Sequence, residues 1–560
     1  MASLFRLAIR RPVLILTLLL AAQTIPTLWT KDVWMEDEVR HAAAAMQMLE
    51  HGHWLVLYLG NEFYADKPPL YFWLLALLSG MLRTTGPVLF MVAAALTAWF
   101  FLFATVATGR ALGLSRRAAL LAGLILLSTY YFIERAHSPR MDLMFCAFIA
   151  LSHLGFFRAF HNDSPGRGRW MAFSFLMAAL ATLTKGPIGA VLPLFSFFVF
   201  AVWQGRFRVQ FDRHMATGFA VFIGLMLLYL AGVIWAEGWD FIYAIVVEQT
   251  WDRAVDAPIL SRPFYFYLHK LPEQLLPWSL IMLFLPWRRL GTRDFWNGLG
   301  RSALTRRESG VAYLGTGLIA SVALMSTWDY KIEFLMLTVF PQAALLLGNH
   351  LTRMPARSRR RYFTALAVLL ALVLAVLPFA ARFTQWPDRV HGGWLVALCG
   401  LPLLAGMVWA RRRGPLVFAL VMTLGCTILF MPYYLVTMRG LNGTMSPRVQ
   451  AGIMSAHERS GYRAFYYDPS VRSIYDYHAG RPIGHLYDLE SVRRTVEETP
   501  CGILAIRNET LDEWNDRPAG LETVDERLID YRTFSLVRWR HPAADGQECP
   551  PPPVVVAPAP

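Results

Sequence analysis

Long apolar runs separated by short polar connections dominate this chain of 560 residues. A helix needs roughly 17–25 consecutive apolar residues to cross a bilayer. Hydrophobic residues make up 56% of the chain and charged residues only 16%, whereas soluble domains carry about a quarter charged residues. The sequence therefore predicts a polytopic α-helical membrane protein.

The net charge of +14 comes from basic residues that lie in short clusters between the apolar runs, such as Arg116–Arg117 and Arg411–Arg413. Basic residues next to spans are retained on the cytoplasmic side during insertion. A nucleic-acid-binding protein would need a compact basic domain, and the sequence contains none. We therefore predict no nucleic-acid partner.

The apolar runs predict about thirteen membrane-spanning helices within residues 1–437. The first run, Pro12–Trp29, follows Arg10 and Arg11, so a cleaved signal peptide is the alternative. The run is longer than a signal core and no A-x-A site closes it, which favours a retained helix. The other predicted spans are Val88–Thr108, Ala118–Ile133, Met141–Phe157, Trp170–Thr184, Ile188–Val202, Ala216–Trp235, Leu275–Trp287, Val311–Ser326, Phe334–Leu347, Phe363–Ala381, Trp394–Ala410 and Leu416–Val436.

A cytoplasmic N-terminus places nearly every arginine cluster inside, and an odd number of spans places the residues after Val436 in the periplasm. Residues 31–87 and 236–274 then form the main outer loops. Within the first loop, Leu70–Arg83 is apolar but only about fourteen residues long, so it is predicted to lie in the interface or to re-enter the membrane. Glu38–Glu50 is predicted to form a second helix along the same face.

Residues 438–549 change in character and predict a small periplasmic α/β domain. Arg463–Tyr467 and Gly502–Ile506 favour strands, and Leu489–Glu498 favours a helix. Cys501 and Cys549 are the only cysteines expected there, and we predict a disulfide between them in an oxidising compartment. The tail 550–560 is rich in proline and is predicted to be disordered.

Ionisable residues close to hydrocarbon are costly and usually functional. Carboxylates suit general-base work or metal binding, and cations suit a ligand that carries phosphate. Such residues gather at the predicted outer ends of the spans: Asp37, Glu38, Arg40, Asp66, Lys67, Arg135, His137, Arg140, Asp142, Lys185, Glu248, Arg253, Asp329, Lys331 and Glu333.

The acids after the first span have a simpler alternative role, because acids in the first turn of a helix complement its dipole. That role does not account for Arg40, so Asp37, Glu38 and Arg40 remain functional candidates. In Asp66-Lys-Pro-Pro-Leu-Tyr71, the prolines hold the acid and the lysine at the start of a short helix. A turn with a solvated ion pair is the alternative.

Thr184-Lys-Gly-Pro187 lies in a tight outer connection. Its lysine suits a phosphate clamp beside the glycine, and a snorkelling anchor is the alternative. Asp142 and Lys331 also border apolar runs, where each is either a site residue or an ordinary interface residue.

Taken together, these motifs resemble a known family. The order of Asp37-Glu38-x-Arg40, Asp66-Lys-Pro-Pro-Leu-Tyr71, Arg140-Met-Asp142, Thr184-Lys-Gly-Pro187, Leu276-Pro-Trp-Ser279 and Lys331 is similar to that in bacterial aminoarabinose transferases. These enzymes belong with protein O-mannosyltransferases in the GT-C group of glycosyltransferases. The resemblance covers roughly residues 1–440, and the outer C-terminal domain agrees in position.

The resemblance implies a GT-C fold with a periplasm-facing cavity, a polyprenyl-phosphate sugar donor, and inverting transfer without a metal. It implies that Asp37 is the essential carboxylate, with Asp142 as its acidic partner and Glu38 as a further candidate. It also implies that the donor phosphate and substrates are bound by Lys67, Lys185 and Lys331, supported by Arg40, Asp66, Tyr71 and Arg140.

Three features depart from the family pattern. Asp66 stands where family members usually have glutamate, and His269 is the one histidine of the long loop. Asp66 and His269 are therefore weak metal candidates, a zinc ion known for the family is doubtful, and we expect no required cofactor. Glu333 stands close to the predicted phosphate ligand Lys331, where a second negative charge is unfavourable.

We therefore expect transfer of a sugar, 4-amino-4-deoxy-L-arabinose, from undecaprenyl phosphate to a lipid A phosphate outside the inner membrane, by a monomer embedded in membrane lipids. Transfer to a protein hydroxyl or to another envelope glycan is the alternative, and Asp37 would then matter more as a general base. A lipid transporter is a weaker alternative, because transporters often contain internal repeats and the sequence contains no clear one.

Overall fold

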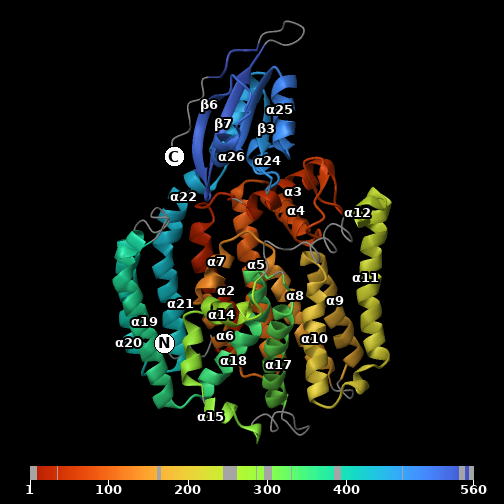
Figure 1. Ribbon diagram of the computed structural model, residues 1–560. Helices are drawn as coiled ribbons and strands as arrows, with labels where there is room; N and C mark the ends of the chain where they lie inside the picture. Colours follow the sequence, from red (N-terminus) through yellow and green to blue (C-terminus); the bar gives the residue numbers. More distant parts are fainter. Residues whose placement is uncertain are drawn as a thin grey trace. The chain divides into compact units, whose positions relative to one another are not determined.

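The computed structural model describes residues 9–34, 36–160, 165–243, 262–285, 287–294, 306–329, 331–383, 393–469, 471–541 and 549–553. Within the predicted outer loop 236–274, residues 244–261 with Glu248 and Arg253 lie outside the described residues, as do 554–560 of the predicted tail. The chain divides into two compact units (Figure 1). Unit 1 comprises Met1–Leu28, Ala65–Tyr71 and Met91–Tyr433, and unit 2 comprises Trp29–Tyr64, Phe72–Phe90 and Tyr434–Pro560.

Unit 1 is helical. Its helices are α2 (Pro12–Thr24), α5 (Pro87–Ala111, from Met91 onward), α6 (Arg116–Leu127), α7 (Tyr130–Ala136), α8 (Asp142–Ala159), α9 (Arg167–Lys185), α10 (Ile188–Trp203), α11 (Arg213–Glu237), α12 (Asp240–Tyr243), α14 (Phe266–Gln274), α15 (Trp287–Leu290), α17 (Arg306–Ser326), α18 (Phe340–Arg353), α19 (Ala356–Val376), α20 (Gly393–Ala410) and α21 (Pro415–Pro432). Short 3₁₀ segments η1 (Ile25–Thr27), η2 (Arg208–Gln210), η4 (Trp278–Phe284), η5 (Glu333–Val339) and η6 (Leu377–Phe383) connect them.

Several of these helices are long and apolar enough to span a membrane. Among the described residues there are eight such helices, or nine if α6 and α7 form one bent span. Three shorter apolar helices, at Pro12–Thr27, Leu70–Leu82 and Ile188–Trp203, come in addition. The polytopic helical architecture is thus confirmed, whereas the total of about thirteen spans stays a prediction.

The predicted single span Ala118–Ile133 is wrong in detail. The structure breaks it between α6 and α7, which are bent by 73°. Ser128 and Thr129 at the break donate their hydroxyls back to the carbonyls of Leu124 and Ile125, at 2.6 and 2.8 Å. Such bonds compete with the helical backbone ladder and bend helices.

The predicted span Leu275–Trp287 is not an α-helix. Its centre is the 3₁₀ segment η4, which follows Pro277 and has only seven residues. At about 2 Å of rise per residue such a segment covers roughly half of the hydrocarbon thickness. Proline cannot donate a backbone hydrogen bond, which explains why the apolar run does not form a regular helix.

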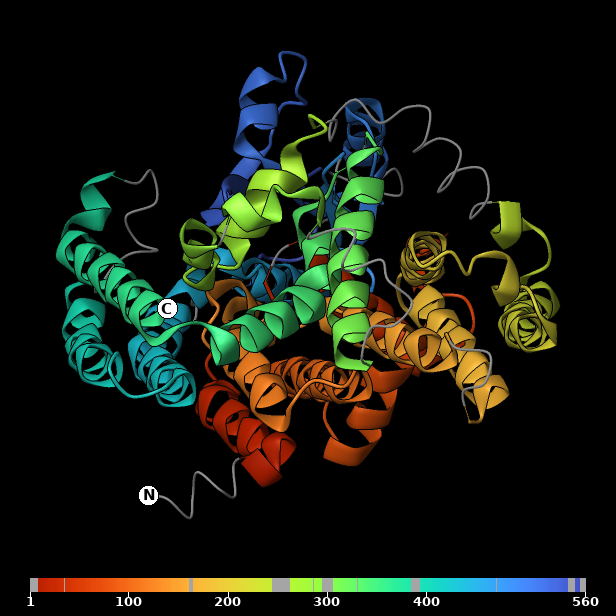
Figure 2. The same ribbon diagram turned by 90° about the horizontal axis from the view of Figure 1, so that it is seen from below.

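Close packing holds the middle of unit 1 together. A Cβ on Gly155 of α8 would lie 2.8 Å from the Ser174 Cβ of α9, so the two helices approach each other where glycine faces serine. The Ser174 hydroxyl also donates to the Ser152 carbonyl at 2.6 Å. Seen from below, α11 (yellow) lies at one edge of the unit, and α19 and α20 (teal) lie at the opposite edge (Figure 2).

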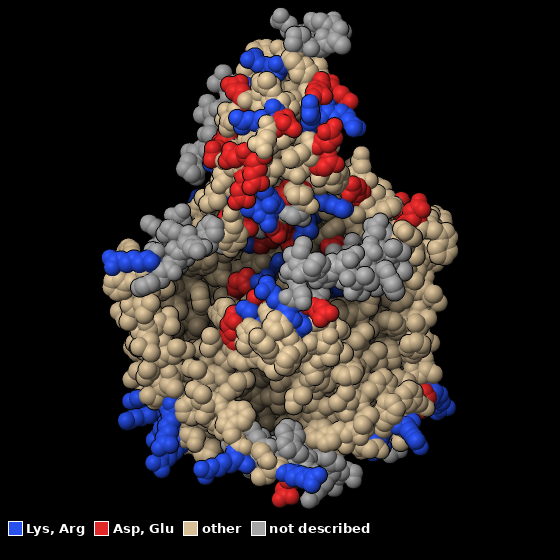
Figure 3. All heavy atoms as spheres, viewed as in Figure 1, with Lys and Arg blue, Asp and Glu red and all other residues tan. Residues whose placement is uncertain are grey.

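The space-filling view shows a broad band of unit 1 with few charged residues, and Lys and Arg gathered at its lower end (Figure 3). Basic residues gathered at one end of a helical membrane unit are typical of the cytoplasmic side.

Unit 2 combines residues 29–64 and 72–90 with the C-terminal part of the chain. The first part contains α3 (Asp37–His51), the hairpin β1 (Tyr58–Leu59) and β2 (Glu62–Phe63), and α4 (Leu70–Leu82, from Phe72 onward). The second part, here called the C-terminal domain, contains α22 (Met438–Met445), α23 (Arg448–Arg459), β3 (Arg463–Tyr467), α24 (Asp476–Ala479), β4 (Gly484–Leu486), α25 (Leu489–Glu498), β5 (Cys501–Arg507), α26 (Asn508–Glu513), β6 (Glu522–Ile529) and β7 (Arg532–Arg540). The π-helical turn η8 (Tyr433–Thr437) precedes α22.

The C-terminal domain is built on a five-stranded sheet of order β4-β3-β5-β7-β6. β3 pairs in parallel with β4 and β5, whereas β7 pairs antiparallel with β5 and β6. Val492 and Val496 of α25 are buried against the sheet with Leu504 and Trp539. The bounds predicted for β3 and α25 agree with the structure, and β5 extends one residue beyond each end of its prediction.

The Cys501–Cys549 pair, for which a disulfide was predicted, is bonded in the structure and closes a loop with a sequence separation of 48 residues. Replacing both cysteines with alanine should lower the free energy of unfolding of the C-terminal domain by about 4 kcal/mol, because the reduced unfolded chain gains loop entropy. Chemical denaturation of the full chain in detergent, followed by pulse proteolysis of this domain, measures the change. The control is Cys146→Ala, at a buried free thiol; equal stability of all three proteins would contradict the prediction.

Candidate functional site

A buried group of three charged residues is the main ionic feature of unit 1. Asp142, at the start of α8, binds Arg140 through Oδ2 at 3.0 Å and Lys185 through Oδ1. Arg140 lies in the turn before α8, and Lys185 ends α9. The Asp142 side chain is 3% exposed and the lysine 11%. This set, the Asp142 trio, thus holds two positive charges and one negative charge away from water.

A phenyl ring covers the two cations of the trio. The Lys185 Nζ lies 3.8 Å from the centroid of the Phe334 ring, and the Arg140 Cζ lies 4.7 Å from it. The ring face carries partial negative charge and attracts both cations. Phe334 therefore helps to fix Arg140 and Lys185 beside each other against their mutual repulsion.

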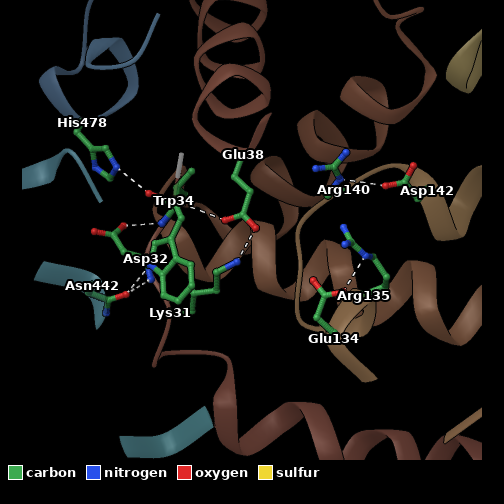
Figure 4. A network of polar contacts seen from close by, with 11 residues as sticks. Lys31, Asp32, Trp34, Glu38, Glu134, Arg135, Arg140, Asp142, Asn442 and His478 are labelled. Atoms are coloured by element: carbon green, nitrogen blue, oxygen red, sulfur yellow. Dashed lines mark hydrogen bonds and ion pairs between the residues drawn. The ribbon is translucent and has the colours of Figure 1, made fainter. Parts of the chain in front are cut away.

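Two further cations act on the trio. Lys67 lies close enough to Lys185 for their charges to repel, and its Nζ is 3.4 Å from the Asp66 carboxylate. Arg135 interacts electrostatically with Asp142 and forms an ion pair with Glu134 at 3.0 Å. Figure 4 shows the Arg135–Glu134 and Arg140–Asp142 pairs. The structure thus brings together Lys67, Arg140, Asp142 and Lys185, which were predicted from separate motifs.

Tyr71, the last residue of the Asp66 motif, is fully buried. His137 is also buried, and its Nδ1 and Nε2 lie 2.8 and 3.2 Å from the carbonyls of Ile133 and Gln23. These backbone contacts give His137 a structural role at the end of α7.

Phe334 lies at the start of η5, and hydrogen bonds hold the two residues that precede η5. The buried Lys331 ammonium donates to the carbonyls of Arg262, at 2.8 Å, and Trp328. The Ile332 N–H donates to the Tyr267 hydroxyl at 3.0 Å. In this conformation Lys331 therefore holds the backbone of the segment.

Glu333 lies two residues after Lys331, which was predicted to bind phosphate. A negative charge close to bound phosphate is unfavourable. The Glu333 carboxylate is 3.0 Å from Lys270 on α14, and the Glu333 carbonyl accepts from the Gln274 side chain at 3.1 Å. The hydrogen bond to Glu333 is the main cause that raises the pKa of the Lys270 ammonium. Glu333 thus shares Lys270 with Glu273, while the next residue, Phe334, contacts the trio.

Replacing Phe334 with leucine should lower turnover at least about tenfold, because two cation–π contacts are lost. Phe334→Tyr retains the ring face and should keep most of the activity. Steady-state kinetics of the purified variants measure the change. An activity of Phe334→Leu equal to that of Phe334→Tyr would show that the ring face is unimportant.

Unit 2 carries the predicted catalytic residues of the first outer segment. Asp37 begins α3 and forms an ion pair with Arg40 one turn later. The Asp37 side chain is 25% exposed and that of Arg40 22%. A carboxylate of this kind is accessible enough to meet a substrate.

Glu38, next to Asp37, is in a different environment. Its Oε1 is 2.5 Å from the buried Lys31 ammonium, and its Oε2 accepts the Trp34 N–H at 3.1 Å. The ammonium also lies 4.6 Å from the centroid of the Trp34 ring. These contacts, visible in Figure 4, give Glu38 a part in holding the start of α3.

Asp66 and His269 were the weak metal candidates. Among the described residues, no three His, Cys, Asp or Glu side chains come together in a group able to hold a metal ion. His269 makes ring contacts with Tyr265 and Phe266. Since a stable zinc site uses at least three protein ligands, the described donors do not fit zinc, and we assign it no step.

The chain is similar to several known membrane proteins. Residues 10–241 match the family model of the dolichyl-phosphate-mannose-protein mannosyltransferases. The crystal structure of ArnT from Cupriavidus metallidurans bound to undecaprenyl phosphate matches with a TM-score of 0.77 at 18% identity, covering 96% of this chain and 98% of that one. The chain thus has the GT-C fold. It is a multi-pass protein of the bacterial inner membrane, as its apolar helices and its relatives indicate.

Two curated relatives of this GT-C protein come from Pseudomonas fluorescens. Undecaprenyl phosphate-alpha-4-amino-4-deoxy-L-arabinose arabinosyl transferase 1 is 23% identical over 373 residues, covering 65% of this chain and 62% of that protein. The corresponding transferase 2 is 25% identical over 411 residues, covering 72% and 66%. The chain thus spans less than two thirds of the length of these relatives.

Sequence reasoning missed two parts of the site. Phe334 is one of 37 phenylalanines, and nothing in its neighbourhood distinguishes it. Lys31 follows the first apolar run directly, where a lysine is typical of a snorkelling anchor. Only the ion pair with the buried carboxylate of Glu38 shows that Lys31 instead helps to hold the start of α3.

Proposed function

We propose that this GT-C protein is a membrane glycosyltransferase that takes a sugar from undecaprenyl phosphate outside the inner membrane. The sugar is 4-amino-4-deoxy-L-arabinose and the acceptor is a lipid A phosphate. The names of the two relatives and the undecaprenyl phosphate bound to the ArnT structure support this choice of donor.

The observation that carries the proposal is the pair of cations in the Asp142 trio. Arg140 and Lys185 both contact the Asp142 carboxylate, at a site where Asp142 is nearly inaccessible to water. Arginine with lysine is a suitable pair for binding a phosphate oxygen. Lys67 brings a further positive charge close to Lys185.

The trio then acts on the leaving group. As an oxygen of the acceptor attacks the anomeric carbon, the bond from that carbon to the donor phosphate breaks, and negative charge grows on the departing phosphate. Arg140 and Lys185 stabilise this charge because Phe334 and Asp142 already hold them in place. Asp142 has both oxygens bound by cations, so its role is to order them rather than to accept a proton.

Asp37 is the carboxylate we assign to the acceptor side. It is partly accessible and bound to Arg40, so it can orient an acceptor or accept a proton from it. With a phosphate acceptor, which is already anionic, the main contribution is orientation. Lys67 supports the donor phosphate next to Lys185.

The test is a deletion strain that carries the wild-type gene, the Lys185→Met variant or an empty vector. Mass spectrometry of lipid A should show a pentosamine-sized addition on phosphate with the wild type only. Membrane blots quantify both proteins, so that the addition is compared per amount of protein. Lipid A that is unchanged by the deletion would refute the lipid A acceptor.

A protein hydroxyl is the second candidate acceptor, supported by the match of residues 10–241 to protein mannosyltransferases. It requires a general base, since a hydroxyl must lose its proton during attack. Glycoprotein profiling of the same three strains separates the two acceptors. Loss of a protein-linked sugar with unchanged lipid A would favour this candidate.

A further inference from the structure

Side chains of the C-terminal domain form hydrogen bonds with the segment between the first predicted span and α3. Residues 31–34 form no helix or strand. The Asn442 Oδ1 accepts the Asp32 N–H at 3.0 Å and the Trp34 indole N–H at 2.9 Å. Its Nδ2 donates to the Thr30 carbonyl at 3.0 Å. One amide side chain thus binds three residues of the segment, and Figure 4 shows its contacts with Asp32 and Trp34.

Two other side chains of the domain add to this attachment. The Ser446 hydroxyl donates to the Asp32 carboxylate at 3.1 Å. The His478 Nε2 lies 3.1 Å from the Val33 carbonyl. Burial is the main cause that lowers the pKa of His478, so its ring is neutral at neutral pH and donates one N–H to that carbonyl.

The attachment continues from the segment to the helix that carries Asp37. Trp34, bound by Asn442 through its indole, donates its backbone N–H to Glu38. Lys31 forms an ion pair with the same carboxylate. Glu38 is the residue next to Asp37 in the first turn of α3. Two successive contacts therefore lead from Asn442 to Glu38, and Asp37 adjoins it in the chain.

We propose that the C-terminal domain positions Asp37 for the reaction and that Asn442 is its main positioning residue. The proposal rests on the proposed function for the role of Asp37. Asn442 touches no substrate; it acts by fixing Thr30, Asp32 and Trp34, and through them the start of α3. The C-terminal domain thereby acquires a role in turnover that is separate from substrate binding.

The test compares Asn442→Ala with Asn508→Ala in the full chain. Asn508 is the matched control, because its side chain also makes a hydrogen bond in this domain, to Ser535 at 2.8 Å, within the sheet region. Asn442→Ala should lower kcat about tenfold to a hundredfold with KM for the donor nearly unchanged. Asn508→Ala should leave kcat unchanged. Asn442→Asp retains the acceptor oxygen but sets a second, negatively charged oxygen against the Thr30 carbonyl, so it should also lower kcat.

Hydrogen exchange of residues 31–48 provides a readout that needs no activity. Exchange there should be at least about tenfold faster in Asn442→Ala and unchanged in Asn508→Ala. Unchanged exchange and kcat in Asn442→Ala, or equal changes in both alanine variants, would overturn the proposal. If the wild type transfers no sugar, the proposed function fails, and unchanged exchange in Asn442→Ala would still separately overturn the positioning role.

Discussion

The Lys185→Met variant should lose sugar transfer by more than about a hundredfold. It removes one of the two cations that balance a growing phosphate charge, and loss of one such donor typically costs this much. It also leaves Asp142 buried with Arg140 alone. Breaking a buried ion pair destabilises a protein by about 3 kcal/mol, so the amount of folded protein should fall too.

Two further variants separate activity from stability. Lys185→Arg retains a cation beside Asp142, so both folded protein and most of the transfer should be retained. Arg167 lies at the other end of α9, about 27 Å from Lys185 along the helix, and binds Asp212 at 2.8 Å. Arg167→Met should lower stability but keep turnover per folded molecule.

The measurements are thermal unfolding in detergent and initial rates at saturating donor. A Lys185→Met protein that keeps its transfer rate per folded molecule would contradict the phosphate-binding role of Lys185. Equal loss of specific activity in Arg167→Met would point to a general effect of ion-pair loss in α9.

Asp37→Asn should abolish transfer, with a loss of about a thousandfold, while the protein stays folded. The Asp37–Arg40 pair is partly exposed, and pairs of this kind contribute at most about 1 kcal/mol. The neighbouring Glu38→Gln should behave in the opposite way. It leaves the buried Lys31 without its carboxylate, so it should destabilise unit 2 by about 3 kcal/mol.

Glu36→Gln is the matched control for Asp37→Asn. Glu36 precedes the helix and binds Arg532 at 2.9 Å with 39% of its side chain exposed. Its replacement should change neither the rate nor the stability appreciably. Initial rates and thermal unfolding of the three variants test the whole set. A catalytic loss in Glu36→Gln equal to that in Asp37→Asn would remove the special role of Asp37.

The sequence predicted the helical class of the chain well. A helix that crosses a membrane is surrounded by lipid and must be apolar, and such apolar runs are visible in the sequence. It predicted α25 to the residue, since that helix has an acidic capping residue and an apolar stripe of Val492 and Val496. It failed where local polar groups override hydropathy, as at Ser128–Thr129, and where Pro277 interrupts an apolar run.

The candidate site could be predicted only in part. A single motif identifies ionisable residues near the membrane, such as Asp142 and Lys185. Burying such residues is costly, so their presence indicates a functional site. The motif does not identify their partners. Phe334 and Asn442 are separated from those motifs by many residues and carry no charge, so only the folded chain relates them to Lys185 and Trp34.

The attachment made by Asn442 has a consequence for biogenesis. Asp32 and Asn442 are 410 residues apart in the chain. At a synthesis rate of about 5–20 residues per second, the segment before α3 leaves the ribosome roughly 20–80 s before the residue that binds it. During that interval the side chain that holds the segment before Asp37 has not yet been made. The protein should therefore become active only after the C-terminal domain has been synthesised and has folded.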